Sequence, residues 1–123
     1  MDIKLISEVY RIGLAIGLLT IEDVINWADK VIEYHDFPPY QFIELSLSTK
    51  ENLEKISLKL MMIEGGVDND LPPKIILGLL NEYLHSTQDM LNVIKIMDKL
   101  IKHLPDTCEW IEIEIHFYQM DII

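Results

Sequence analysis

Apolar residues recur every three or four positions along most of the chain, as they do on one face of an α-helix. In the first stretch Leu5, Val9, Ile12 and Ile16 follow this spacing, which predicts a helix over 2–18. Similar apolar stripes follow further along, separated by short polar segments. The pattern therefore favours an all-α chain of six to seven short helices.

Hydroxyl residues precede three of the later stripes and predict helix N-caps at Thr20, Ser48 and Ser86. Acidic residues lie three positions after both serines, at Glu51 and Asp89, in the spacing of a capping box. Prolines break the pattern at Pro38-Pro39, Pro72-Pro73 and Pro105. A proline forces the preceding residue out of helical geometry and tolerates the start of a new helix, so each break is expected to end one helix and begin another.

The proline breaks are spaced by 34 and then 33 residues, whereas the caps are spaced by 28 and then 38. This spacing of breaks and caps fits an internal duplication, and it also fits helical units that resemble one another without a common origin. Both interpretations predict three helix–turn–helix units after an N-terminal helix, arranged as a compact bundle or as an array of helical hairpins. We expect residues 1–123 to form a single domain of this kind.

Two interpretations compete in "WIEIEIHFY", residues 110–118. Apolar and polar residues alternate there, which is typical of a strand. Trp110, Ile113, Phe117 and Met120 also share one helical face. A helix is favoured, because a lone strand would have no pairing partner in a helical chain. The aromatic residues Tyr34, Tyr40, Trp110 and Tyr118 fit either core packing or an interface.

The net charge of −11 is concentrated near the two ends of the chain. Residues 1–49 hold eight acidic and three basic residues, and residues 103–123 hold five acidic residues and no lysine or arginine. Such charge repels nucleic acid and anionic membrane surfaces, so neither is an expected partner. It fits a solvated surface, or a docking surface for a basic protein.

Motifs that carry chemistry are missing from the sequence. The four histidines form no pair with metal-ligand spacing, Cys108 is the single cysteine, and "DNDLPP" lacks the glycine and glutamate of a calcium loop. We therefore expect no enzyme activity, no cofactor and no metal site. No signal peptide or membrane span is indicated, and the single cysteine suits a reducing compartment, so a cytoplasmic location is expected.

The stretch "GLLTIEDVINWADKVIEYHDFPPYQFIELSLS", residues 17–48, resembles a block found in small uncharacterised bacterial helical proteins. Some of these proteins are similar to immunity proteins, which pair with secreted bacterial toxins. The resemblance implies a shared helical fold and no catalytic residue. The positions that carry it are Thr20, Glu22, Asp23, Trp27, Ala28, Asp29, Pro38, Pro39, Glu44 and Ser46.

These observations lead to one functional hypothesis and one alternative. The hypothesis is a non-enzymatic protein-binding module, an immunity-type inhibitor that neutralises a basic toxin. Its expected contact residues are Asp29, Glu33, Asp36 and Tyr40, with a second acidic cluster at Glu109, Glu112 and Glu114. The alternative is a structural or adaptor protein that forms a homodimer through an apolar helix face such as "IILGLLNEYL", residues 75–84.

Overall fold

The computed structural model describes residues 2–122, and all regular structure in this range is helical. The elements are α1 (Ile3–Ile16), α2 (Ile21–Tyr34), α3 (Tyr40–Ser46), α4 (Leu53–Met61), α5 (Leu71–Ser86), α6 (Met90–Ile101), the 3-10 helix η1 (Asp106–Cys108) and α7 (Glu109–Ile122). The all-α prediction is confirmed. The strand alternative for 110–118 is wrong, because a helix satisfies its backbone groups internally and needs no partner strand.

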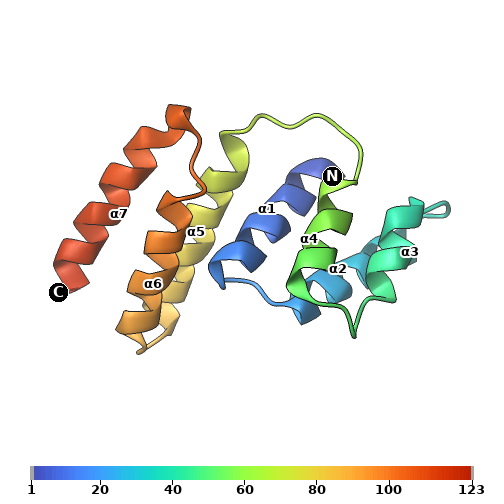
Figure 1. Ribbon diagram of the computed structural model, residues 1–123, viewed down its shortest axis with the longest axis horizontal. Helices are drawn as coiled ribbons and strands as arrows, with labels where there is room; N and C mark the ends of the chain where they lie inside the picture. Colours follow the sequence, from blue (N-terminus) through green and yellow to red (C-terminus); the bar gives the residue numbers. More distant parts are fainter. Residues whose placement is uncertain (1, 123) are drawn as a thin grey trace.

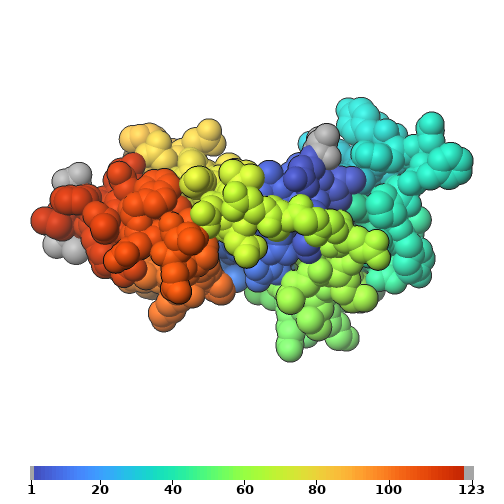
Figure 2. Space-filling view, turned by 90° about the horizontal axis from the view of Figure 1, so that it is seen from above, coloured from blue at the N-terminus to red at the C-terminus, as the bar shows by residue number. Residues whose placement is uncertain are grey.

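The N-terminal helix α1 lies in the middle of the molecule rather than at its edge (Figure 1). It packs against α4 on one side and against α5 and α6 on the other. Beyond α4, α3 packs against α2, and beyond α6 lies α7. The helices therefore form an elongated row, with α7 at one end and the turn between α2 and α3 at the other (Figures 1 and 2).

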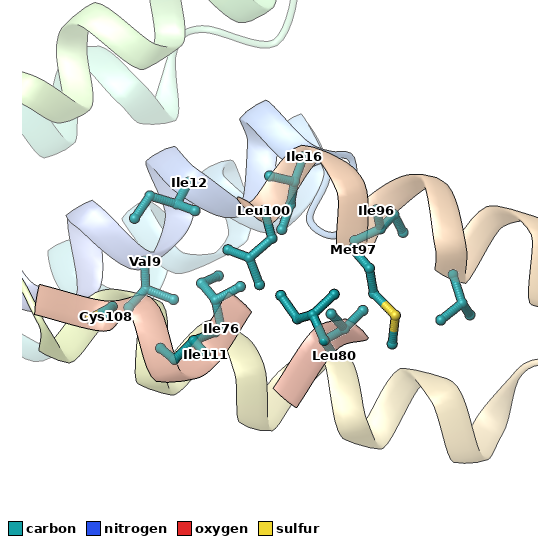
Figure 3. Packing of buried hydrophobic residues seen from close by; sticks show 12 residues of the cluster. Val9, Ile12, Ile16, Ile76, Leu80, Ile96, Met97, Leu100, Cys108 and Ile111 are labelled. Carbon is teal, nitrogen blue, oxygen red and sulfur yellow. The ribbon is translucent and has the colours of Figure 1, made fainter. Parts of the chain in front are cut away.

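Two hydrophobic cores share α1, because this helix is apolar on two faces. Val9, Ile12 and Ile16 pack with residues of α5, α6 and α7, including Ile76, Leu100 and Ile111 (Figure 3). The opposite face of α1 contributes to a second core, built with α2, α3 and α4 from buried residues that include Leu14, Val24, Phe42, Leu45, Ile56 and Leu60. Burial on both sides explains the central place of α1.

This placement of α1 corrects the predicted order of helix pairs. The first and third predicted units form, since α2 packs on α3 and α6 packs on α7. The middle unit does not form: α1 lies between α4 and α5, and the segment that joins them runs past the end of α1 (Figure 1). Each proline break therefore lies at or just before the start of a helix, but the breaks do not produce a regular stack, and the break at Pro72-Pro73 does not itself end α4.

Of the three predicted caps, only Thr20 is confirmed. The Thr20 hydroxyl accepts from the Asp23 amide at 3.2 Å, and the Asp23 carboxylate accepts from the Thr20 amide at 2.8 Å. Asn52 caps α4 and Asp89 caps α6, each accepting from the amide three residues later. Both caps lie immediately before their apolar stripes, so the predictions at Ser48 and Ser86 were three or four residues too early.

The two glycines of α1 have different roles. Gly17 has φ +80°, a left-handed conformation that ends the helix, and the Leu18 and Leu19 amides then donate to the Gly13 carbonyl. The chain folds back so tightly that a β-carbon at Gly13 would collide with the Leu19 side chain. The close neighbour of Gly13 is therefore the segment that directly follows the helix.

Candidate binding surfaces

The structure separates the two predicted acidic clusters. Asp29, Glu33, Asp36 and Tyr40 lie on α2, on α3 and on the turn between them, whereas Glu109, Glu112 and Glu114 lie on α7. These elements occupy opposite ends of the row (Figures 1 and 2). The two clusters therefore form two surfaces rather than one face.

We call the first surface the α2–α3 corner and define it by Glu33, Tyr34, Asp36, Phe37, Tyr40 and Glu44. Its three aromatic side chains are far more exposed than apolar residues of a folded core: Phe37 is 94%, Tyr34 80% and Tyr40 67% exposed. Such residues supply large contact areas when a partner removes them from water. The corner therefore has the composition of a protein interface.

Local chemistry fixes the shape of this corner. The Val31 carbonyl lies 2.9 Å from His35 Nδ1 at the end of α2. Pro38 and Pro39 follow, and Pro39 has φ −54° and ψ 142° as the N-cap of α3, one residue ahead of its predicted place inside the helix. Because proline rings restrict the backbone in the free protein, the corner loses less entropy when it binds a partner.

The carboxylates of the corner form no ion pair. Glu33 and Asp36 are exposed and Glu44 is half-buried. The nearest lysine in sequence is Lys30, three residues before Glu33 on α2, and residues 31–49 contain no lysine or arginine. None of the ion pairs in the described chain involves these three residues. Negative potential of this kind attracts a basic surface.

Asp29 differs from the other predicted contact residues, because its carboxylate accepts a hydrogen bond from the Ser46 hydroxyl. This bond joins α2 to α3 and thereby helps to fix the relative position of the two helices that form the corner. Trp27 has a related structural role, since it stacks on Tyr10 with ring centroids 4.8 Å apart and meets the Phe42 ring edge to face at 5.1 Å. These positions hold the surface in place.

The second surface lies on α7, which presents different apolar residues inward and outward. Ile111 and Ile115 are buried against the core. The residues whose spacing predicted the helix point the other way, with 46–72% exposure, and we call them the α7 outer stripe: Trp110, Ile113, Phe117 and Met120. Ile113, Phe117 and Met120 line a shallow apolar depression together with His116.

Sequence reasoning missed Phe37, and of the outer stripe it offered only Trp110 as a possible interface residue. Phe37 belongs to no periodic pattern, although its position directly before Pro38 excludes it from a helix. The alternative apolar set on α7, Ile111 and Ile115, has an equally helical spacing. Periodicity alone cannot say which of two apolar faces is covered.

The face of α5 proposed for self-association is mostly used within the protein. Ile76 and Leu80 are buried, and Leu77, Leu79, Tyr83 and Leu84 pack partly against the same core. Ile75 is the apolar residue of this segment that remains exposed, at 39%. This arrangement leaves little of α5 for a second copy.

The groups with potential chemistry have structural surroundings. Cys108 is buried, and burial, together with the nearby Asp70, raises the pKa of its thiol, which therefore stays protonated at neutral pH. A polar hollow near α1 is lined by Glu8, Arg11, Lys102 and His103 among others. Within it Arg11 Nε donates to Glu8 Oε2 at 2.9 Å, so the guanidinium is already paired.

Glu8 shows what this pairing does. Burial would by itself raise the pKa of the Glu8 carboxyl, but hydrogen bonds and charges from Arg11 and Lys4 outweigh burial and hold that pKa below its usual value. Among the residues whose side chains the structure describes, no three histidine, cysteine or acidic residues are grouped to hold a metal ion. No helix within residues 2–122 is long and apolar enough to cross a bilayer.

Comparison of the chain with protein-family models, with curated proteins and with solved structures finds no match. The exposure, charge and rigidity of its own surfaces are therefore the basis for assigning a role.

Proposed function

We propose that the protein is a non-enzymatic binding module whose α2–α3 corner docks on a basic partner protein. The observation that carries the proposal is the exposure of Tyr34, Phe37 and Tyr40 on a proline-restricted turn beside unpaired carboxylates. The carboxylates steer a positively charged surface toward the corner, and the aromatic side chains then exclude water from the contact.

The most concrete form of this role is an immunity-type inhibitor in the cytoplasm that covers a basic toxin domain. The resemblance of residues 17–48 to proteins similar to immunity proteins supports this form. Residues 17–48 include every residue that defines the α2–α3 corner. A small acidic protein with a preformed aromatic surface suits such a contact, because little needs to be ordered on binding.

Affinity capture from the native host, at low and at high salt, tests the proposal. The baits are the unmodified full chain and three variants of it: Phe37→Ser, Tyr40→Ser, and the pair Glu33→Gln and Asp36→Asn. We expect the unmodified chain to retain one basic protein at low salt. We expect each of the three variants to retain less of that protein. Each aromatic change should raise the dissociation constant about tenfold, as for a hot-spot residue.

The matched control is Leu58→Ser, which removes another exposed apolar side chain, on α4 and outside the corner. The control should retain the partner as the unmodified protein does. Capture of no basic protein at low salt would contradict the proposal. Equal capture by the corner variants would also contradict it, since the partner would then use another surface.

A further inference from the structure

The last helix of the row, α7, has a surface that a terminal helix does not normally carry. Helices at the ends of stacked arrays usually present a polar outer face to water. α7 buries Ile111 and Ile115 on its inner side and leaves Trp110, Ile113 and Phe117 exposed on its outer side. It therefore has the pattern of an internal helix with one neighbour missing.

The spacing of the exposed residues fits a helical neighbour. Positions 110, 113, 117 and 120 follow one face and extend along about 15 Å of helix axis. The shallow depression between Ile113, Phe117 and Met120 offers a place for an apolar side chain of that neighbour. This is the arrangement in which an amphipathic helix lies along a complementary face.

The charges beside the stripe define the neighbour further. At 3.6 residues per turn, Glu109 and Glu112 lie along one edge of the stripe and Glu114 along the other. Residues 103–123 contain no lysine or arginine, and His116 Nε2 lies 3.7 Å from Glu112 Oε1. A second copy placed with its α7 on this helix would bring carboxylates against carboxylates.

We infer that the α7 outer stripe is a docking surface for a partner helix whose apolar stripe is flanked by lysine or arginine. This surface is separate from the α2–α3 corner, because the two lie at opposite ends of the row (Figure 1). The inference goes beyond the proposed function and does not depend on it. One molecule would then contact two partners, or two parts of one long partner.

A pair of synthetic helical peptides tests the inference on the full chain. Both carry leucines along one face, flanked by lysines in the first peptide and by glutamates in the second. Titration calorimetry measures affinity, and the emission of Trp110, which is half-exposed, reports contact at the stripe. We expect the lysine peptide to bind and shift this emission to the blue, and we expect no binding of the glutamate peptide.

Two variants separate apolar contact from charge. The pair Ile113→Ser and Phe117→Ser keeps every carboxylate, and we expect it to weaken the lysine peptide at least tenfold. The triple change Glu109→Gln, Glu112→Gln and Glu114→Gln should weaken binding and reduce its salt dependence. Since all five residues are at least partly exposed, circular dichroism should show a folded chain in each case. Leu58→Ser, on α4 and outside both surfaces, serves as the control that binds normally.

Four results would overturn the inference. Equal binding of the serine variant would mean that charge alone attracts the peptide. Equal binding of the glutamate peptide would remove the argument for a basic partner. A stable dimer in sedimentation equilibrium that Phe117→Ser disperses would identify a second copy as the occupant. Loss of the peptide signal in Phe37→Ser would likewise place the contact at the corner.

Discussion

The two tryptophans occupy opposite environments. Trp27 is 8% exposed and packs between Tyr10 and Phe42, whereas Trp110 is 46% exposed on the outer side of α7. Buried indoles emit at shorter wavelength and are reached slowly by quenchers, whereas exposed indoles behave in the opposite way. The same residue type therefore marks a core at one end of the molecule and an open surface at the other.

Replacing Trp110 with Phe should shift the mean emission of the folded protein to the blue and remove most of the quenching by acrylamide. The remaining signal belongs to Trp27, which is shielded by its aromatic neighbours. Steady-state fluorescence with and without acrylamide measures both effects. Strong residual quenching in the folded variant would show that the core around Trp27 is open.

Glu8 gives a pH-dependent prediction. Its folded pKa is lowered by Arg11 and Lys4, so it binds protons less readily than in the unfolded chain. Its stabilising effect is therefore fully present above the unfolded pKa, near 4.5, and is lost as the pH falls through the folded pKa. Glu8→Gln should lower the free energy of unfolding by about 1 kcal/mol at pH 7, as expected of such an ion pair.

Urea denaturation at a series of pH values from neutral to strongly acidic measures this difference. The curves of the unmodified protein and of Glu8→Gln should converge at the acid end, where Glu8 is protonated in both states. Arg11→Gln should reduce the pH dependence in the same window. A difference that stays constant down to strong acid would exclude the charge of Glu8 as its source.

At the scale of the elements, four helices, α1, α2, α4 and α6, begin at a side-chain cap. Asn52 begins α4 and Asp89 begins α6, whereas Ser48 is buried and its hydroxyl donates to the Glu44 carbonyl at 2.6 Å. Ser48 also accepts from Lys59 Nζ at 2.7 Å, which connects the end of α3 with α4. The hydroxyl that resembled a cap is thus part of a contact between helices.

Asn52→Ala should lower the free energy of unfolding by about 1 kcal/mol, because the Lys55 amide loses its acceptor at the start of α4. Ser86→Ala is the control, since the exposed Ser86 hydroxyl caps no helix and donates to the Tyr83 carbonyl within α5. We expect its effect to stay below about 0.5 kcal/mol. Urea denaturation of both variants measures the two losses in free energy of unfolding. A larger loss for Ser86→Ala than for Asn52→Ala would contradict the assignment of Asn52 as a stabilising cap.

Periodicity predicted the existence of the helices well, because apolar spacing depends on local geometry. Periodicity did not predict that α1 lies in the centre of the molecule. Its sequence, "IKLISEVYRIGLAI", has apolar residues on two faces, and this pattern is compatible with a place at the edge of the row or in its centre. The candidate binding residues were likewise predictable only in their local properties. The exposure of Glu33 and Asp36 follows from their charge, but the separation of the two clusters depends on contacts between distant segments.

At the scale of the whole molecule, two cores are joined by a single helix. Cys108 lies in the core formed by α1, α5, α6 and α7, and Trp27 lies in the core formed by α1 to α4. Neither core keeps all its buried contacts without α1, because Ile16 and Leu14 belong to different cores. The two cores should therefore lose structure together.

Two probes measure this coupling in urea. In the Trp110→Phe background, emission reports the core around Trp27, and the reaction of a disulfide reagent with Cys108 reports the other core. Cys108 is the single cysteine, so the second signal has one source. We expect coincident midpoints, as in a two-state transition. Separate midpoints would show that each half is stable alone and that α1 does not couple them.

The central place of α1 also has a consequence for synthesis of the protein. Translation produces α1 before any of its neighbours, yet one of its faces is covered only after α4 is complete and the other only after α5 and α6 have followed. While the ribosome is still adding those segments, α1 has native partners only on α2 and α3, and most of its apolar side chains stay uncovered. Chaperones that bind exposed apolar segments would find their main target in α1. The central helix is thus the first to be made and the last to be fully covered.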